Sequence, residues 1–265
     1  MSTAARSFGE RLRWWRGRRG LAQLDLALTA ETSQRHLSFL ESGRAAPSRE
    51  MVLRLSAALD LPFREQNALL LAAGFAPAWR ERDIAAPEFA AVNRALDFIL
   101  AQQEPYPALV IDRRWNLLRA NRGAGRLVEF LAGGTPPAAG RVNLAVQLVA
   151  PEGLRPYIVN WQEVALHMVR SVHADALADG SAETAELLRR LLAFPDVPSL
   201  AQLPPLEDGA PVLAMHFRRD GISLQLFTTI ATLGTPQDVT LQEIRIESFF
   251  PADAATAEIF RSWAA

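Results

Sequence analysis

A run of short helical patterns at the start of the chain limits what it can fold into. Apolar residues recur at helical spacing from Phe8 to about Ala73, and glycine, serine or proline repeatedly interrupts them. Isolated helices shorter than about 12 residues are marginal in water, so each of these must be stabilised by packing against the others. This part of the chain is therefore expected to form a small all-α bundle.

Five helices are expected in this bundle, and two of them form a helix-turn-helix. Ser33 can cap the third helix, because a serine hydroxyl can accept a hydrogen bond from a free N–H group of the first turn. The expected helices run from Phe8 to about Gly20, from Gln23 to about Thr29, from Gln34 to Glu41, from Pro47–Ser48 onward, and from about Pro62 to Ala73.

The third expected helix has one apolar face and one polar face. Leu37 and Leu40 lie on the first, and Gln34, Arg35 and Ser38 lie on the second. The major groove of DNA is about 12 Å wide and admits one helix. An amide such as Gln34 can pair with adenine, and a guanidinium such as Arg35 can pair with guanine. This pattern predicts a helix that reads base edges.

Two residues beside this helix are expected to contact phosphates. Gln23 begins the preceding helix, where an amide and helix N-terminal N–H groups can hold a phosphate. Arg44 lies just past the third helix. The charge agrees with this hypothesis: residues 1–82 carry a net charge of +5 and residues 83–265 a net charge of −6, with arginine as the only strongly basic residue type.

Residues 8–60 resemble the Cro/XRE-type helix-turn-helix of phage repressors and bacterial regulators. The carrying string is LRWWRGRRGLAQLDLALTAETSQRHLSFLESGRAAPSREMVLRLSAALDL. Glu31 departs from the family, which usually has glycine in this turn, at a cost of roughly 1 kcal/mol if φ stays positive. The resemblance implies that the DNA-binding residues are Gln23, Ser33, Gln34, Arg35, Ser38 and Arg44.

The spacing of the apolar residues changes after about residue 105, which indicates a second domain. We expect a helix-turn-helix domain over residues 1–78, a connecting helix and linker over 79–104, and an α+β domain over 105–265. The connecting helix carries Phe89, Val92, Leu96 and Ile99 on one stripe, and could couple the domains or form part of a dimer seam. Flexible loops are expected at Gly133–Gly140 and Val197–Pro211.

The second domain is expected to contain two strands, a block of helices, and three more strands. Arg219-Asp220-Gly221 is a tight hairpin signal between two of these strands. The expected strands are Ala108–Asp112, Trp115–Ala120, Val212–Arg218, Ile222–Thr232 and Thr240–Phe250. The expected helices are Asn121 to about Leu131, Asn143–Val149, Gly153–Tyr157, Trp161–Ala178, Ala182–Leu192 and Ala252–Trp263.

This order of elements is that of a PAS-like domain, in which an antiparallel sheet faces helices. Residues 92–263 also resemble the ligand-binding domain of MmyB-like transcription regulators. The strings PALVIDRRWNLLRAN, EGLRPYIVNWQEVA and LFTTIATLGTPQDVTLQEIRIESFFPAD carry this resemblance. The resemblance implies a PAS-like sensor of a small apolar ligand, and fatty-acid-type ligands are proposed for the family.

The apolar positions of this domain could line a ligand cavity or form an ordinary solid core. A fatty-acid head group would need a cation or hydrogen-bond donors at the mouth of such a cavity. The candidate ligand-binding residues are Arg155, Tyr157, Asn160, Trp161, Val164, Met168, Met215, His216, Phe217 and Leu226.

No catalytic constellation or metal-ligand spacing stands out in the sequence. The chain has no cysteine, which excludes disulfides and thiolate sites, and its four histidines lack metal-site spacing. We therefore expect no enzyme activity, no metal and no cofactor beyond a bound apolar ligand. An enzyme fused to the helix-turn-helix would need a deep pocket with opposed acid and base.

The expected protein is a cytoplasmic, nucleoid-associated regulator with no membrane insertion. A single short recognition helix contacts few base pairs, so a homodimer on two DNA half-sites is expected. The alternative is a DNA-tethered interaction module whose second domain has a solid core and binds a partner protein.

Overall fold

The computed structural model describes residues 7–133, 142–199 and 212–264, which form two compact units. The first unit contains residues 1–82, Ala176–Ala182 and Thr235–Gln242. The second contains Asp83–Asp175, Glu183–Gly234 and Glu243–Ala265. The expected loops at Gly133–Gly140 and Val197–Pro211 fall almost entirely outside the described residues.

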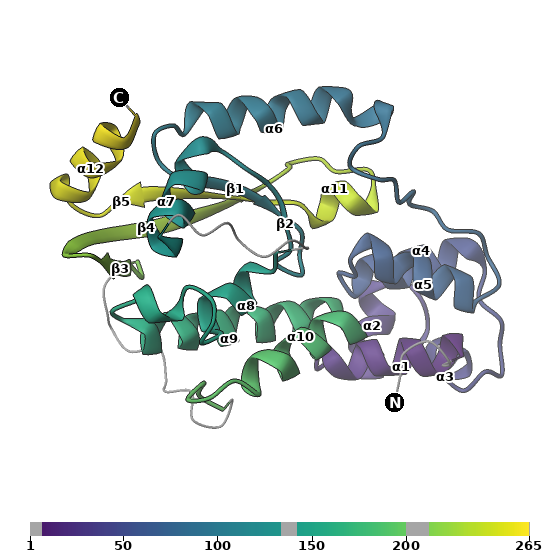
Figure 1. Cartoon of the computed structure of the whole chain (residues 1–265). Helices are drawn as coiled ribbons and strands as arrows, with labels where there is room; N and C mark the ends of the chain where they lie inside the picture. Colours follow the sequence, from purple (N-terminus) through teal and green to yellow (C-terminus); the bar gives the residue numbers. More distant parts are fainter. Residues whose placement is uncertain (1–6, 134–141, 200–211, 265) are drawn as a thin grey trace. The chain divides into compact units, whose positions relative to one another are not determined.

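The first unit is built around five short helices, as the sequence predicted. They are α1 (Phe8–Arg18), α2 (Gln23–Thr29), α3 (Gln34–Glu41), α4 (Arg49–Ala58) and α5 (Phe63–Ala72) (Figure 1). Ser7, Ser33 and Ser48 cap α1, α3 and α4, each accepting a hydrogen bond from a backbone N–H group of the first turn. These caps satisfy groups that have no partner within the helix.

One apolar core holds these helices together. It is formed by buried side chains from all five helices and the segments between them, including Leu12, Trp15, Leu26, Leu37 and Leu55. Gly9 allows α1 to lie close to α3, because a Cβ atom there would be 2.5 Å from the Leu40 carbonyl oxygen.

The second unit contains an antiparallel sheet with helices on both faces. Its strands are β1 (Ala108–Ile111), β2 (Leu117–Ala120), β3 (Met215–Arg219), β4 (Ile222–Thr232) and β5 (Arg245–Pro251). Their order across the described sheet is β2-β1-β5-β4-β3. Asp220 and Gly221 both have positive φ and join β3 to β4, so the hairpin expected there is present.

The helices of the second unit cover the two faces unequally. Helix α6 (Ala90–Gln102), preceded by the 3-10 turn η2 (Pro87–Phe89), lies on one face (Figure 1). Toward the other face lie α8 (Leu144–Val149), η3 (Arg155–Tyr157), α9 (Trp161–Asp179) and α10 (Ala182–Leu192). The remaining helices of this unit are α7 (Arg122–Ala132) and α12 (Ala254–Ala264). The short helix α11 (Val239–Glu243) belongs to the first unit, apart from its last residue.

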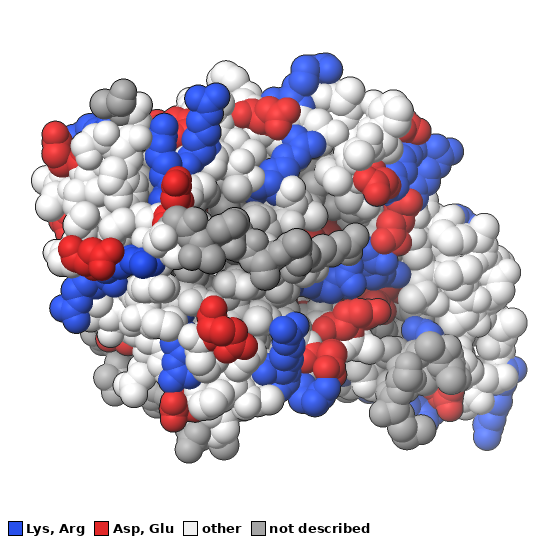
Figure 2. Space-filling model, in the orientation of Figure 1, with Lys and Arg blue, Asp and Glu red and all other residues white. Residues whose placement is uncertain are grey.

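One side of the connecting helix, α6, packs against the sheet. In the second unit, α6 contacts β1 and buries Leu96 and Leu100, while Phe98 is 67% exposed on the opposite side. Side chains of both charges lie next to one another over the visible surface of this unit (Figure 2), so no field of one sign covers it.

Several expected elements differ in the structure, and the strands expected from Trp115 and Val212 begin only at Leu117 and Met215. The strand expected over Thr240–Phe250 was wrong in its first part, where Val239–Glu243 forms α11. The Asp238 carboxylate accepts the Thr240 N–H at 3.0 Å, and this cap outweighs the β-branched residues that favoured a strand. The helix expected over Gly153–Tyr157 is only the 3-10 turn η3, and the last helix begins at Ala254 rather than Ala252.

Candidate nucleic-acid interface and ligand-binding core

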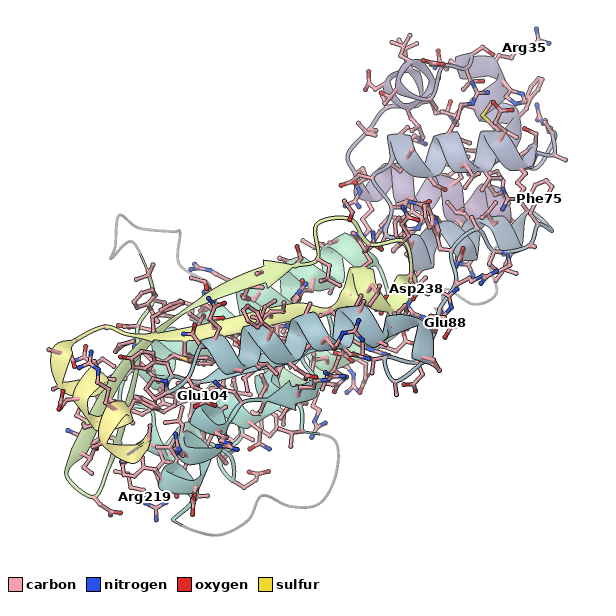
Figure 3. All side chains as sticks on the ribbon, turned by 90° about the horizontal axis from the view of Figure 1, so that it is seen from above. Arg35, Phe75, Glu88, Glu104, Arg219 and Asp238 are labelled. Carbon is pink, nitrogen blue, oxygen red and sulfur yellow. The ribbon has the colours of Figure 1, made fainter. Side chains whose placement is uncertain are left out.

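Helix α3 presents a polar surface at its N-terminal end. Ser33 accepts the His36 N–H at 3.1 Å, which fixes the first turn, and Leu37 and Leu40 are fully buried. Gln34 and Arg35 are exposed, and Ser38 is half-buried one turn later. Arg35 extends away from the helices of its unit (Figure 3). The first turn of α3 is therefore free to enter a groove and donate hydrogen bonds to base edges.

The other end of α3 is fixed by a buried acid. The Glu41 side chain has no exposed surface, and it accepts two hydrogen bonds from Arg16, at 2.6 and 3.1 Å. The Gln23 amide donates to it at 2.8 Å. Burial alone would raise the pKa of Glu41, but the hydrogen bonds from Arg16 and Gln23 and the nearby positive charge hold it below its ordinary value. Three elements are thereby joined at one carboxylate.

The residues expected to contact phosphates differ in their surroundings. Gln23 lies at the N-terminus of α2, and its amide nitrogen is already committed to Glu41. The second N–H of its amide, its side-chain oxygen and the backbone N–H groups of the first turn of α2 remain for other partners. Arg44 is exposed and follows Gly43, whose φ of 72° ends α3.

The turn between α2 and α3 has the left-handed backbone conformation for which the family usually has glycine. Glu31 has φ of 51° and its side chain is exposed. The backbone stays in this conformation because Thr32 N–H donates to the Ala27 carbonyl at 2.8 Å, which closes the end of α2. The helix-turn-helix geometry is thus retained with a strained residue in the turn.

In the second unit, five of the candidate ligand residues share one apolar core. Val164 and Met168 of α9 are buried with Met215, Phe217 and Leu226 of the sheet. Strand register explains this grouping, because Met215 pairs with Leu226 and cross-strand partners lie on the same face. These side chains pack against one another between α9 and the sheet.

Two other candidates line an open pocket at the start of α9. The pocket has a volume of about 380 Å³. Its lining residues are Pro151, Arg155, Pro156, Trp161, Pro195 and Asp196. The Arg155 guanidinium lies 3.7 Å from the centroid of the Trp161 ring and pairs with Asp196 at 2.7 Å. A positive charge therefore lies beside an apolar floor.

The remaining three candidates have other partners. Asn160 bridges to β3: its amide donates to the Ala214 carbonyl at 2.8 Å, and its oxygen accepts the His216 N–H at 3.0 Å. The His216 side chain alternates with the buried Met215 and Phe217, so it is on the opposite face of the sheet from the core, 2.5 Å from the Ser223 hydroxyl. The Tyr157 ring lies under Arg219, at 5.1 Å.

Sequence reasoning missed the polar side chains on the core face of β5. Arg245 and Glu247 alternate with the apolar residues of this strand, a pattern that predicts a solvent-exposed face. Register places them instead on the core face, because Glu247 pairs with Leu109, a core residue. Arg245 forms an ion pair with Asp175 of α9, which also accepts the Trp115 indole N–H at 3.1 Å.

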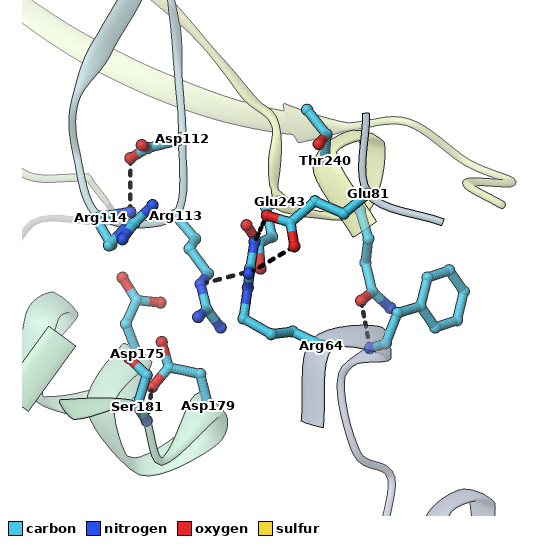
Figure 4. Close-up of polar contacts among 12 residues, drawn as sticks. Arg64, Glu81, Asp112, Arg113, Arg114, Asp175, Asp179, Ser181, Thr240 and Glu243 are labelled. Carbon is cyan, nitrogen blue, oxygen red and sulfur yellow. Dashed lines mark hydrogen bonds and ion pairs between the residues drawn. The ribbon is translucent and has the colours of Figure 1, made fainter. Parts of the chain in front are cut away.

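Glu247 is a buried acid without a cationic partner in any contact described for it. Its residue surface is 7% exposed, and burial raises its pKa to about 7, with a hydrogen bond to Thr228 acting in the opposite direction. A second largely buried acid, Glu243, pairs with Arg113 at 3.2 Å (Figure 4), and both side chains are about 10% exposed or less. The strand pattern alone did not predict that either carboxylate would be buried.

The described residues contain neither a metal-ligand cluster nor a membrane-spanning helix. Within residues 7–133, 142–199 and 212–264, no cluster of three or more histidine, aspartate or glutamate side chains has the geometry to hold a metal. In the same part of the chain, every helix is too short or too polar to cross a membrane.

Comparison with known families decides the identity of the second unit. Residues 92–262, more than half of the chain, match the MmyB-like transcription regulator ligand binding domain. The chain belongs to the MmyB-like transcription regulators. Residues 12–66 match a helix-turn-helix family. This regulator therefore combines a DNA-binding domain with a ligand-binding domain, and both resemblances found in the sequence are confirmed.

Two solved structures are also similar to this chain. The restriction-modification controller protein C.AhdI from Aeromonas hydrophila is 36% identical, with a TM-score of 0.22; the match covers 22% of this chain and 89% of that one. An RNA-binding light-oxygen-voltage receptor is 14% identical, with a TM-score of 0.28; the match covers 98% of this chain and 62% of that one. The comparison with curated proteins gave no match.

Proposed function

We propose that this MmyB-like regulator binds operator DNA through α3 as a homodimer, and that a small apolar ligand of the fatty-acid type in its second unit controls that binding. The observation that carries the proposal is the exposed Gln34–Arg35 pair on a capped helix, whose far end is fixed by Glu41. Gln34 and Arg35 would read adenine and guanine, and Ser38 would extend the contact by one turn. Ser33, Gln23 and Arg44 would contact phosphates.

The ligand would lie between α9 and the sheet, with its polar end at the pocket beside α9. The core side chains Val164, Met168, Met215, Phe217 and Leu226 offer an apolar surface for a chain. Arg155 and Trp161 would receive a carboxylate, because a guanidinium binds a carboxylate through two parallel hydrogen bonds. Arg155 is now paired with Asp196, which is 71% exposed at its side chain and could be displaced.

The strand order β2-β1-β5-β4-β3 supports a PAS-like sensor. In this proposal the regulator acts without catalysis, and its place is the cytoplasm, at the nucleoid. Two copies would bind half-sites about 10 bp apart, since one recognition helix reads too few base pairs for a genomic site.

Mass spectrometry of an organic extract of the purified full-length chain tests the ligand. We expect a long-chain acid at near-equal molar ratio to protein, and much less of it in the same extract from Arg155→Ala. Arg189→Ala, an exposed arginine on α10, is the matched control and should retain the acid. An extract without lipid from a chain that also fails to bind added dodecanoate would contradict the ligand assignment.

DNA binding is tested separately. Operator sequences are selected in vitro from a random duplex pool with the wild-type chain, and the selected site is examined for two half-sites. Native mass spectrometry of the complex should give two protein chains on one duplex. A single chain on a single half-site would contradict the dimer.

A second candidate function rests on the surface of α6. Phe98 is 67% exposed, and its neighbours Ala91, Ala95 and Ala101 are exposed as well. Exposed apolar patches mark interaction sites in many proteins. The second unit would then be an interaction module that binds a partner protein, with its interior a solid core. Analytical ultracentrifugation of Phe98→Ser distinguishes the two uses of this surface: loss of the dimer assigns the patch to a second copy of this chain, and an unchanged dimer leaves it for another protein.

A further inference from the structure

We propose that helix α9 transmits the state of the ligand-binding core to the DNA-binding helices through a clamp formed by Arg18, the last residue of α1, and Arg19, which follows it. This inference rests on the proposed function, since it explains how a ligand there could control DNA affinity. Helix α9 contributes to both compact units: it runs from Trp161 to Asp179, and its last residues, from Ala176 onward, belong to the unit that contains α1.

The first part of α9 lies in the ligand-binding core. Val164, Met168 and Val172 are almost fully buried there, four residues apart, so one stripe of the helix faces the sheet. A ligand that enters this core must displace or repack that stripe, because protein interiors have little free volume. The position of α9 therefore depends on what the core contains.

The last turn of α9 is held by arginines. Arg18 Nε donates to the Leu177 carbonyl at 2.8 Å, and a terminal nitrogen of the same side chain donates to the Ala176 carbonyl. Arg19 donates to the Ala178 carbonyl at 3.4 Å. The last four carbonyls of a helix have no partner within it and carry partial negative charge. The Ala176 carbonyl also accepts the Gly180 N–H at 3.1 Å. The two guanidinium groups therefore supply donors chiefly to Leu177 and Ala178, together with the favourable charge.

The turn after α9 fits closely against α1. Gly180 has φ of +61°, and a Cβ atom there would lie 2.6 Å from Cη2 of Trp14 and 2.9 Å from Cη2 of Trp15. The Ser181 N–H donates to Asp179 Oδ1 at 2.8 Å, which closes the turn (Figure 4). Both the backbone angle and the space thus require glycine at this contact.

The other helix that α1 contacts in this proposal is the recognition helix, α3. Helix α1 holds α3 through the hydrogen bonds from Arg16 to Glu41 and through the close approach at Gly9. Arg16 and Arg18 are two residues apart on α1, so one turn of this helix contacts both the end of α9 and the end of α3. A shift of α9 along its axis therefore acts on the helix that orients the base-reading residues.

The consequence is a coupling between ligand and DNA. A ligand changes DNA affinity only if it binds the two arrangements of α9 with different affinity. The same coupling free energy then makes DNA change the ligand affinity by the same factor. The clamp is the place where the coupling can be broken without touching either the core or the base-reading residues.

A double-mutant cycle tests the clamp with neither ligand nor DNA present. Val172→Ala perturbs the core end of α9, and Met168→Leu, which conserves volume, replaces it if that variant does not fold. Hydrogen exchange of the full chain is then followed in the last turn of α1, from Trp15 to Arg18. We expect the core substitution to accelerate exchange there by about 3- to 30-fold with Arg18 present, and by less than 2-fold in the Arg18→Ala background.

Gly180→Ala should abolish the coupling between the core substitution and exchange in α1, as Arg18→Ala does. Arg189→Ala on α10 should leave the double-mutant cycle as in the wild type. Equal acceleration with and without Arg18, or no acceleration in either background, would overturn the clamp.

A second arm includes the ligand. Dodecanoate should change the affinity of the wild-type chain for its selected operator, and Arg18→Ala should reduce that change to less than 2-fold while dodecanoate still binds. If dodecanoate neither binds nor alters DNA affinity in the wild type, the ligand class of the proposed function is wrong, and the exchange cycle still decides the clamp.

Discussion

Arg16 and Glu41 form a two-hydrogen-bond ion pair that joins α1 to the C-terminal end of the recognition helix. The two donor–acceptor distances are 2.6 and 3.1 Å, and the side chains are 17% and 0% exposed. A carboxylate with no exposed surface depends on its partners for solvation. The orientation of α3 thus depends on one buried charge and on the groups that neutralise it.

Loss of either partner should destabilise the first unit. Removing one member of a buried ion pair costs about 3–5 kcal/mol, because the other charge is left uncompensated. We expect Arg16→Ala to have this effect on the free energy of opening of α1 and α3, measured by native-state hydrogen exchange of the full chain at pH 7. Glu186→Gln, in an exposed pair on α10, is the control and should leave that free energy unchanged. A loss as small as in the control would show that the pair does not brace α3.

The same pair predicts the effect of acid. The pKa of Glu41 is held below its ordinary value of 4.5 in the folded chain. Its stabilising contribution is therefore complete above pH 4.5, and is lost as the pH falls through the lower, folded-state pKa. Glu41→Gln should flatten the dependence of α3 protection on pH in this acidic range, as hydrogen exchange corrected for intrinsic rate can measure.

Much of the first unit could be predicted from sequence, because local signals decide it. Ser33 and Ser48 mark helix starts by their own capping chemistry, and Gly43 marks an end by its backbone freedom. The exposed polar face of α3 followed from the same pattern, since Leu37 and Leu40 fix which side of α3 is buried. The partner of Gln23 could not be predicted, because Glu41 is brought to it by tertiary packing.

The second unit shows where such signals fail. Arg245 and Glu247 have the alternation of a strand with one wet face, yet the sheet is covered on both faces, and their side belongs to the core. The cap at Asp238 likewise changed Val239–Glu243 from strand to helix. The first outcome depends on a partner far along the chain, Asp175 for Arg245, that no local pattern reveals. The second is a local capping signal, two residues from Thr240, that the β-branched residues of the segment concealed.

Glu247 should make the second unit less stable as the pH rises. Its pKa is about 7 in the folded chain, against 4.5 ordinarily, so the folded state holds a proton that the unfolded state has released. Stability therefore falls between pH 4.5 and 7 and stays low above it, by about 3 kcal/mol in all. Glu247→Gln should remove this loss and raise the melting temperature at pH 8 but not at pH 4.5. Glu258→Gln on α12, whose carboxylate is exposed, should show no such pH-dependent gain.

Arg35 should determine sequence preference rather than general affinity. Its side chain is exposed at the first turn of α3, where a guanidinium can bind guanine through two hydrogen bonds. Arg35→Ala should weaken binding to the selected operator by about 1–3 kcal/mol and relax the preference at one base pair. Gln23→Ala, at a proposed phosphate contact, should weaken operator and random duplex alike. Gel shifts with equal losses on both duplexes for Arg35→Ala would refute its role.

Glu31 should be replaceable by glycine with a gain in stability. Its φ of 51° lies in the left-handed region, where a non-glycine residue costs roughly 1 kcal/mol, and its exposed side chain has no packing to lose. Glu31→Gly should therefore stabilise the first unit by up to about 1 kcal/mol, as measured by urea unfolding. Ala57→Gly, at an exposed position in the last turn of α4, provides the matched comparison and should destabilise by up to about the same amount. If both glycines destabilise equally, the turn does not store strain at Glu31, and the retained side chain must then contribute contacts that offset the backbone cost.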